Sequence, residues 1–251
     1  MTFDISIITC KSTYNRVENI FTSLLKLLET KEVRDIRIIL EHDIEYMERA
    51  VFENKNWDQH IQTIREILAI NIRDSKSLGE KKLSDLLDYL IDQFFTAREL
   101  RDAEMSLLWK HFHALKMARD LPMLILEDDA ELNQNQIETL VEATKLSAEK
   151  NIFVDLGVMK GLCSRGKLKI SNGVSFYVQP IGCTRTTVAA IWPPDAAMKV
   201  SDNYWPCSLP ADLHHQYLLS KLKLEGAWPA MSIFRHLSSG DCRVYKTSIQ
   251  T

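Results

Sequence analysis

The stretch LPMLILEDDAEL (residues 121–132) decides the fold of this 251-residue chain. It is an apolar run of strand length that stops at three consecutive carboxylates, Glu127, Asp128 and Asp129. In an open parallel sheet, ligands bind outside the carboxyl ends of the strands. The three acids therefore predict a functional site at the end of a buried strand. The alternative is that they only cap the next helix or face water.

The flanking sequence predicts an α/β domain with a mostly parallel central sheet. The opening reads as strand 4–9 (DISIIT), a helix from Arg16 with Asn15 as its N-cap, and strand 35–43 (DIRIILEHD), and this β–α–β order favours parallel pairing. Further helices are predicted at 44–66, 80–95, 97–119, 133–150, 194–200 and 210–222, and further strands at 68–73, 151–157, 174–182, 185–193 and 228–234. The strands at 174–182 and 185–193 are expected to flank a turn, and the first half is expected to be the helix-rich one.

Composition excludes several classes of protein. The chain has 8 glycines, where average usage predicts roughly 17, and the first is Gly79. A dinucleotide fingerprint or P-loop in the first βα turn is therefore excluded. A net charge of −3 argues against a nucleic-acid partner. With no long apolar stretch, no basic leader and five cysteines without a CxxC pair, the expectation is a cytoplasmic protein with reduced thiols.

Clustered carboxylates at a strand end are typical of a site for Mg²⁺ or Mn²⁺. A receiver-type phosphoacceptor domain would carry paired acids after its first strand, but that strand ends in Thr9 and Cys10. A nucleotide-sugar transferase of the GT-A type carries an acidic motif after its fourth strand and needs no glycine-rich loop. The second class fits both the position of the acids and the scarcity of glycine.

Residues 98–133 resemble glycosyltransferase family 25, the lipooligosaccharide and collagen galactosyltransferase family. That family has a helix reading roughly GEIGCALSH, a short spacer and a strand ending in ILEDD. Here AEMSLLWKH (103–111) lies over the first motif; Glu104 and His111 match it, while Ala103 and Lys110 depart from its Gly and Ser. The opening SIITCKSTYNRVENI resembles the broader GT-A transferases of family 2. The resemblance implies a GT-A-like, Rossmann-type sandwich.

The resemblance also implies where a nucleotide-sugar donor binds. The nucleotide would lie over the first two strand ends, near Thr9, Arg16 and Asp43, although Asp43 is equally well explained as a turn acid. Glu104 and His111 are two helical turns apart and share a face that borders the site. A half-buried helix histidine is the other reading of His111.

The same resemblance assigns the metal site. Asp129 would hold Mn²⁺ or Mg²⁺, with Glu127 or Asp128 reaching the metal or the ribose. His236, after the last predicted strand, is the best-placed histidine for a further ligand; a surface turn histidine is the alternative. The metal would stabilise the departing nucleoside diphosphate.

Asp212 opens a short helix in the second half, PADLHHQYLL (210–219). In GT-A enzymes an acid at such a position often faces the acceptor, so the resemblance makes Asp212 the candidate general base. An inverting transferase needs a base for the acceptor hydroxyl, although Asp at this position is also an ordinary helix cap. The adjacent His214 and His215 point about 100° apart on a helix, so at most one lines the site.

These inferences predict a single domain, with residues 1–130 as the donor half and 131–251 as the acceptor half. The expected activity is metal-dependent transfer of a hexose, for example galactose from UDP-galactose, to a glycan such as lipopolysaccharide core or capsule. A lipid-linked acceptor would allow peripheral association with the inner membrane; the oligomeric state stays open. Two rivals are a Mg²⁺-dependent nucleotidyltransferase, to which Asp155 would add a carboxylate, and a non-catalytic nucleotide-sugar or glycan-binding scaffold.

Overall fold

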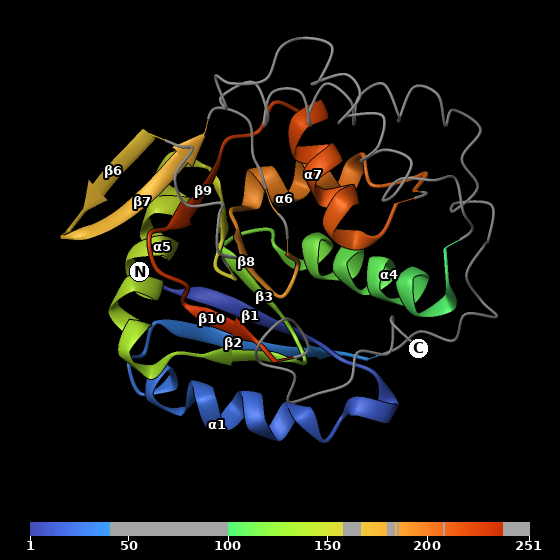
Figure 1. Cartoon of the computed structure of the whole chain (residues 1–251), viewed down its shortest axis with the longest axis horizontal. Coiled ribbons are helices and arrows are strands. Elements are labelled where there is room, and N and C mark those ends of the chain that lie inside the picture. The colour runs from blue at the N-terminus through green and yellow to red at the C-terminus, as the bar shows by residue number, and fades with distance from the viewer. Residues whose placement is uncertain (41–99, 158–166, 180–183, 185, 208, 238–251) are drawn as a thin grey trace, which may run out of the picture.

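An eight-stranded mixed sheet forms the centre of the molecule (Figure 1). The computed structural model describes residues 1–40, 100–157, 167–179, 184, 186–207 and 209–237. Along the sheet the order is β2 (Val33–Ile39), β1 (Phe3–Ile8), β3 (Met123–Glu127), β8 (Ala189–Trp192), β5 (Phe153–Asp155), β9 (Gly226–Pro229), β7 (Val174–Gln179) and β6 (Lys167–Ser171). Only β8 and β7 run against the other strands. The predicted α/β class with a mostly parallel sheet is confirmed.

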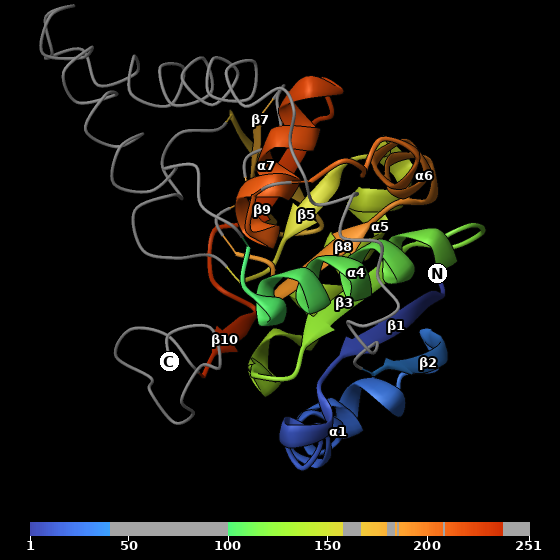
Figure 2. The same cartoon turned by 90° about the vertical axis from the view of Figure 1, so that its right-hand side faces the viewer.

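Helices cover both faces of this sheet (Figures 1 and 2). One layer holds α1 (Arg16–Leu28) and α5 (Ile137–Lys150), and the other holds α4 (Asp102–Met117), α6 (Pro194–Asp202) and α7 (Ala211–Lys221). Short 3-10 turns precede α1 (Lys11–Thr13) and α5 (Gln134–Gln136). A separate two-stranded sheet pairs β4 (Ala130–Leu132) with β10 (Phe234–His236).

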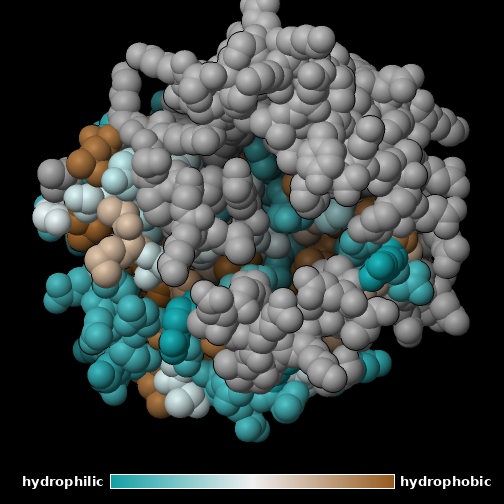
Figure 3. All heavy atoms as spheres, viewed as in Figure 1, coloured by the Kyte–Doolittle hydropathy of each residue, from teal (hydrophilic) through white to brown (hydrophobic). Residues whose placement is uncertain are grey.

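The apolar run of β3 is explained by its place between these layers. Leu124 and Leu126 pack in the core with α1 and α5, whereas Met123 and Ile125 pack in the core with α4, α6 and α7. A strand covered on both faces has no polar side to show, so its sequence is continuously apolar. By contrast, α1 exposes one side, and Figure 3 shows mostly hydrophilic side chains over the lower part of the face, where Figure 1 places this helix.

The parallel β–α–β opening is confirmed, since β1 pairs in parallel with β2. The predicted Asn15 cap is only partly right: Asn15 precedes α1, but its side chain makes no capping hydrogen bond because its backbone is already helical. The helix predicted from residue 97 begins at Asp102, where extended Arg101 starts a capping box with Glu104.

The predicted turn between residues 174–182 and 185–193 is wrong. β7 pairs with β6 and β9, while β8 lies between β3 and β5. All four residues of β8 are buried, and only the middle of the sheet covers both faces of such a strand. The strand predicted at 228–234 is divided into β9 and β10, which belong to different sheets. β6 was not predicted.

Several predictions lie outside the described residues, namely the helices at 44–66 and 80–95, the strand at 68–73 and the site residue Asp43. The helix-rich first half is therefore seen only through α1 and α4. Within the described ranges, no helix is long and apolar enough to cross a membrane.

Candidate functional site

The candidate site lies at the carboxyl ends of β1 and β3. These strands are parallel neighbours in which Ile8 is in register with Glu127. The residues that follow each strand, Thr9 on β1 and Asp128 on β3, therefore meet at the same edge of the sheet. This is the edge at which ligands bind in open α/β sheets.

Asp128 ties the acidic turn to the loop between β1 and α1. Its Oδ2 accepts hydrogen bonds from Thr9 Oγ1 at 2.9 Å and from the Thr13 hydroxyl, and its Oδ1 lies 3.3 Å from Arg16 Nη1. The Asp128 and Arg16 side chains are only 14% and 15% exposed. Three of the predicted donor-binding residues, Thr9, Arg16 and Asp128, are thus in one network. Thr13 was missed in the sequence, where it stands in an ordinary polar turn.

Glu127 faces α4 rather than the β1–α1 loop. Its Oε1 lies 3.2 Å from His111 Nε2, and His111 is buried. Sequence reasoning placed His111 beside the site, and the structure brings it against the acidic triplet. Its partner in the motif, Glu104, is also buried, but its Oε2 accepts the Arg101 backbone N–H at 2.9 Å. Glu104 therefore caps α4.

Asp129 meets His236 from the small sheet. Pairing of β4 with β10 places His236 opposite Ala130, and His236 Nε2 lies 2.9 Å from Asp129 Oδ2. Burial alone would lower the pKa of His236. The hydrogen bond to Asp129 and the charges of Asp129 and Glu127 outweigh it and raise the pKa above its ordinary value.

The fit of these residues to a divalent cation can be judged from the donor set. Among the described residues, no group of three His, Cys, Asp or Glu side chains is arranged to hold a metal ion, because Glu127 turns to His111 while Asp129 turns to His236. Carboxylate oxygen suits Mn²⁺, whereas imidazole suits this ion less well but is tolerated. Protein sites for Mg²⁺ commonly use one or two carboxylates plus substrate phosphates. Asp129 and His236 therefore fit a cation that is completed by a bound diphosphate.

Asp212, in the first turn of α7, is electrostatically coupled to the acidic cluster. Burial raises its pKa, and the charges of Glu127 and Glu104 raise it further, while a hydrogen bond from the Leu213 backbone N–H (2.9 Å) acts in the opposite direction. The predicted base thus lies within charge range of the strand-end acids.

Both histidines that follow Asp212 are core residues. His214 Nε2 lies 2.8 Å from the Tyr204 carbonyl oxygen, and His215 Nε2 lies 3.1 Å from the Tyr204 hydroxyl. His215 packs edge-on against His111 with ring centroids 4.9 Å apart. Burial, and then the charges of His111 and His214, lower the pKa of His215. Of the two, His215 packs against His111 and so helps to hold its ring in place.

Lys110 is a site residue that sequence analysis singled out only as a departure from the family motif. It is buried at 2% exposure. Its Nζ donates to the Thr9 carbonyl oxygen and approaches Cys10 Sγ, each at 3.1 Å. The same helix, α4, thus brings His111 to Glu127 and a cation to the end of β1.

Asp155, the extra carboxylate of the nucleotidyltransferase alternative, lies in a closed environment. Its oxygens accept hydrogen bonds from Thr184 Oγ1 (2.9 Å), Thr186 Oγ1 (3.4 Å) and the Gly157 backbone N–H (3.0 Å), and it is 2% exposed. A Cβ at Gly157 would come within 2.3 Å of the Val188 side chain. This close approach explains why glycine stands there.

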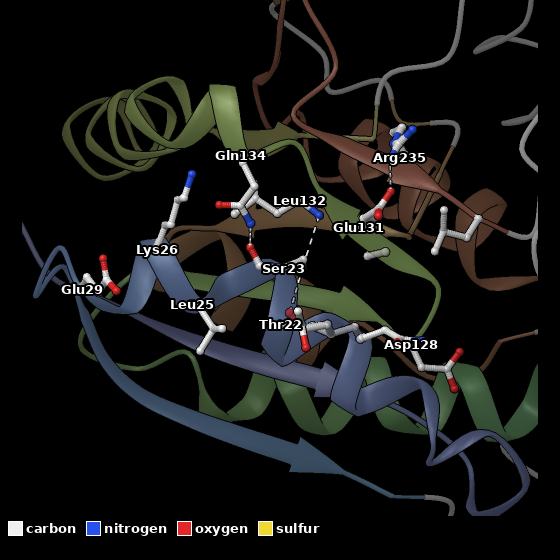
Figure 4. A pocket seen from close by; sticks show the side chains of 14 residues that line it. Thr22, Ser23, Leu25, Lys26, Glu29, Asp128, Glu131, Leu132, Gln134 and Arg235 are labelled. Atoms are coloured by element: carbon white, nitrogen blue, oxygen red, sulfur yellow. Dashed lines mark hydrogen bonds and ion pairs between the residues drawn. The ribbon is translucent and has the colours of Figure 1, made fainter.

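An open groove of about 930 Å³ runs along α1 and borders Asp128 (Figure 4). Asp128 lies at one end and Lys26 and Glu29 lie toward the other, and Arg235 pairs with Glu131 across its upper side. Arg235 thus forms an ion pair with Glu131 at the surface and not with the acids at the end of β3. The groove lies on the α1 side of the sheet, whereas Asp212 belongs to the opposite layer.

No protein-family model matches this chain, and no curated protein does. Among the solved structures similar to it is a UTP-bound UGPase from Acinetobacter baumannii, with 10% sequence identity and a TM-score of 0.42. The similarity covers 91% of this chain and 86% of the other.

Proposed function

We propose that this protein is a metal-dependent glycosyltransferase that uses a nucleotide-sugar donor. The observation that carries the proposal is the convergence of four elements on one acidic turn. The β1–α1 loop binds Asp128, α4 binds Glu127, β10 binds Asp129, and α7 brings Asp212 within charge range. The resemblance of residues 98–133 to glycosyltransferase family 25 supports the same reaction class.

In this proposal the donor lies over the ends of β1 and β3. Thr9, Arg16 and Asp128 would shape the pocket for the nucleoside, together with Asp43 from outside the described residues. His111 acts by holding Glu127, and Glu104 acts by fixing the first turn of α4. The donor is expected to be UDP-linked, with galactose as one candidate sugar.

Asp129 and His236 would hold the divalent cation, Mn²⁺ or Mg²⁺, and Glu127 stays a predicted ligand. When bound, the cation supplies Lewis-acid stabilisation of the leaving diphosphate. Asp212 accepts the proton of the acceptor hydroxyl as that oxygen forms its bond to the anomeric carbon. The bond from that carbon to the diphosphate breaks, and its electron pair leaves on the phosphate oxygen. The raised pKa of Asp212 makes it a stronger base than an ordinary aspartate.

The acceptor is proposed to be a hydroxyl of a glycan such as lipopolysaccharide core or capsule, free or lipid-linked, and the stereochemical outcome inversion. Both features follow from the family resemblance. A lipid-linked acceptor would bring the protein to the membrane surface from the cytoplasm.

A nucleotidyltransferase would usually need a further carboxylate on a strand close to the acidic turn. The candidate Asp155 already accepts hydrogen bonds from two threonines and a backbone N–H within the core. This favours the glycosyltransferase. A non-catalytic scaffold would bind nucleotide-sugars without turnover, so turnover separates it from both enzymes.

The test is a screen of nucleotide-sugars for Mn²⁺-dependent binding and slow hydrolysis, with Asp129→Ala beside the native protein. The matched control is Asp202→Ala, because Asp202 pairs with Lys116 on the exposed side of α6. We expect Asp129→Ala to weaken metal-dependent binding at least about 10- to 100-fold and Asp202→Ala to leave it unchanged. If no nucleotide-sugar binds, or if Asp129→Ala keeps metal-dependent binding, the proposal is wrong.

A further inference from the structure

Lys110 carries a buried charge that the proposed mechanism does not use. Lysine is almost never fully buried unless it is paired, yet Lys110 is 2% exposed. An ammonium group has three donors and no acceptor. Two of the Lys110 donors have partners, the Thr9 carbonyl oxygen and Cys10 Sγ. Neither partner is a carboxylate, and no ion pair among the described residues includes Lys110.

The neighbouring cation shows the contrast. Arg16 stands at the same strand end, but its guanidinium is committed to Asp128 at 3.3 Å. Thr9 joins the two groups, since its hydroxyl binds Asp128 and its carbonyl oxygen binds Lys110. Among the buried residues that the structure describes, Lys110 is therefore the cation at the end of β1 without a carboxylate partner; Lys11, which follows the same strand, is exposed.

Burying an uncompensated charge costs free energy, which an anionic ligand recovers when it binds. The position of Lys110 beside the end of β1 is where a nucleotide is expected in the proposed function, and this inference rests on that function. We infer that Lys110 binds a phosphate oxygen of the donor diphosphate and so supplies part of the anion recognition that the glycine-poor first half lacks. The charge-assisted hydrogen bond is made by the donor itself, without the metal.

The experiment measures binding of UDP, uridine and inorganic pyrophosphate by titration calorimetry in EDTA. The protein is compared with Lys110→Met, which keeps the length of the side chain and removes its charge. Lys116→Met is the matched control, because Lys116 lies on the same helix but is exposed and paired with Asp202 at 3.1 Å. Melting temperatures are recorded for all three proteins.

We expect Lys110→Met to bind UDP and pyrophosphate about 10- to 100-fold more weakly than the native protein and to bind uridine equally well. The variant should melt at the same or a higher temperature, because it does not bury a charge. Lys116→Met should bind all three ligands as the native protein does.

Equal losses of affinity for UDP and uridine would overturn the inference in favour of a contact with the base. A lower melting temperature with unchanged UDP affinity would overturn it in favour of a purely structural cation. The native protein is also titrated with UDP in Mn²⁺. If it binds UDP neither in EDTA nor in Mn²⁺, the proposed function fails together with the inference. If it binds UDP in Mn²⁺ but neither UDP nor pyrophosphate in EDTA, or if Lys110→Met binds UDP in EDTA as tightly as the native protein does, only the inference fails.

Discussion

Two carboxylates at the same edge of the sheet, Asp128 and Asp155, have nearly the same partners and different surroundings. Asp155 ends β5 and Asp128 follows β3, and both strands run antiparallel to β8 between them. Each carboxylate accepts from two threonine hydroxyls. The third partner is a backbone N–H for Asp155 and the Arg16 guanidinium for Asp128.

The surroundings of the two carboxylates indicate which strand end can bind a ligand. Around Asp155 the donors described above are two threonine hydroxyls and a backbone N–H, and the side chain is buried. Around Asp128, further acids, a buried lysine and two histidines face a partly exposed turn. Three consecutive carboxylates lie there, and a bound cation would reduce the repulsion between them. The predictions below test this division between a structural and a functional strand end.

The largest effect is expected for Asp212→Asn. If Asp212 is the base, turnover should fall by about 10²- to 10⁴-fold. Burial and the charges of Glu127 and Glu104 raise its pKa, so turnover of the native protein should rise with pH through that raised pKa, and the variant should lose this limb. The measurement is a pH–rate profile, with Asp202→Asn as control; an unchanged rate would dismiss Asp212 as the base.

The same variant has a stability signature. Because the folded protein holds the Asp212 proton more tightly than the unfolded chain does, stability falls as pH rises from the ordinary aspartate range through the raised pKa. Asparagine does not ionise, so the Asp212→Asn variant does not lose stability in this way as the pH rises. Asp212→Asn should therefore melt at the same or a higher temperature at neutral pH. A clear drop would indicate misfolding rather than loss of a base.

Asp155→Ala should damage the fold and spare the site. It leaves the buried Thr184 hydroxyl and the Gly157 N–H without their acceptor, at a cost of about 1–3 kcal/mol in the free energy of unfolding. Denaturant unfolding measures this loss. Nucleotide affinity, measured well below the melting temperature, should not change. If Asp155→Ala loses nucleotide affinity but keeps its stability, Asp155 is not a purely structural residue, and the nucleotidyltransferase alternative is favoured.

Asp128→Ala should show the opposite pattern. Removing the shared acceptor takes one hydrogen-bond partner from each of Thr9, Thr13 and Arg16, and so loosens the start of the β1–α1 loop. Nucleotide affinity should fall about 10- to 100-fold, while stability should change less than in Asp155→Ala because Asp128 is partly exposed. Calorimetric titration and denaturant unfolding on both variants complete the comparison. Matching stability losses would show that both carboxylates are structural.

The smallest effect is expected for Glu104→Gln. Glutamine can keep the capping hydrogen bond to Arg101, but it removes one of the charges that raise the pKa of Asp212. The acid limb of the pH–rate profile should therefore move to lower pH with the melting temperature preserved. If the acid limb of the profile does not move, the charge of Glu104 does not affect the pKa of Asp212.

Local sequence determined much of this molecule. The apolar run before Glu127 is a strand because only a strand buried on both faces tolerates such continuity, and the β–α–β opening paired in parallel as its order required. The acidic triplet was placed at a strand end for the same reason. Periodicity reports which side of an element is buried, and that information is local.

Only the tertiary structure decided which distant groups meet these acids. Nothing in the sequence pairs Asp128 with Thr13 or Lys110 with the end of β1, and only the family resemblance put Asp129 and His236, 107 positions apart, in one site. The sequence also does not distinguish the roles of Asp155 and Asp128, because both are acids at the end of an apolar strand. Partner choice depends on strand order and on which helix covers which face, and these are set by packing of the whole sheet. The sequence therefore determined that acids end a buried strand, and the fold decided which of them a ligand can reach.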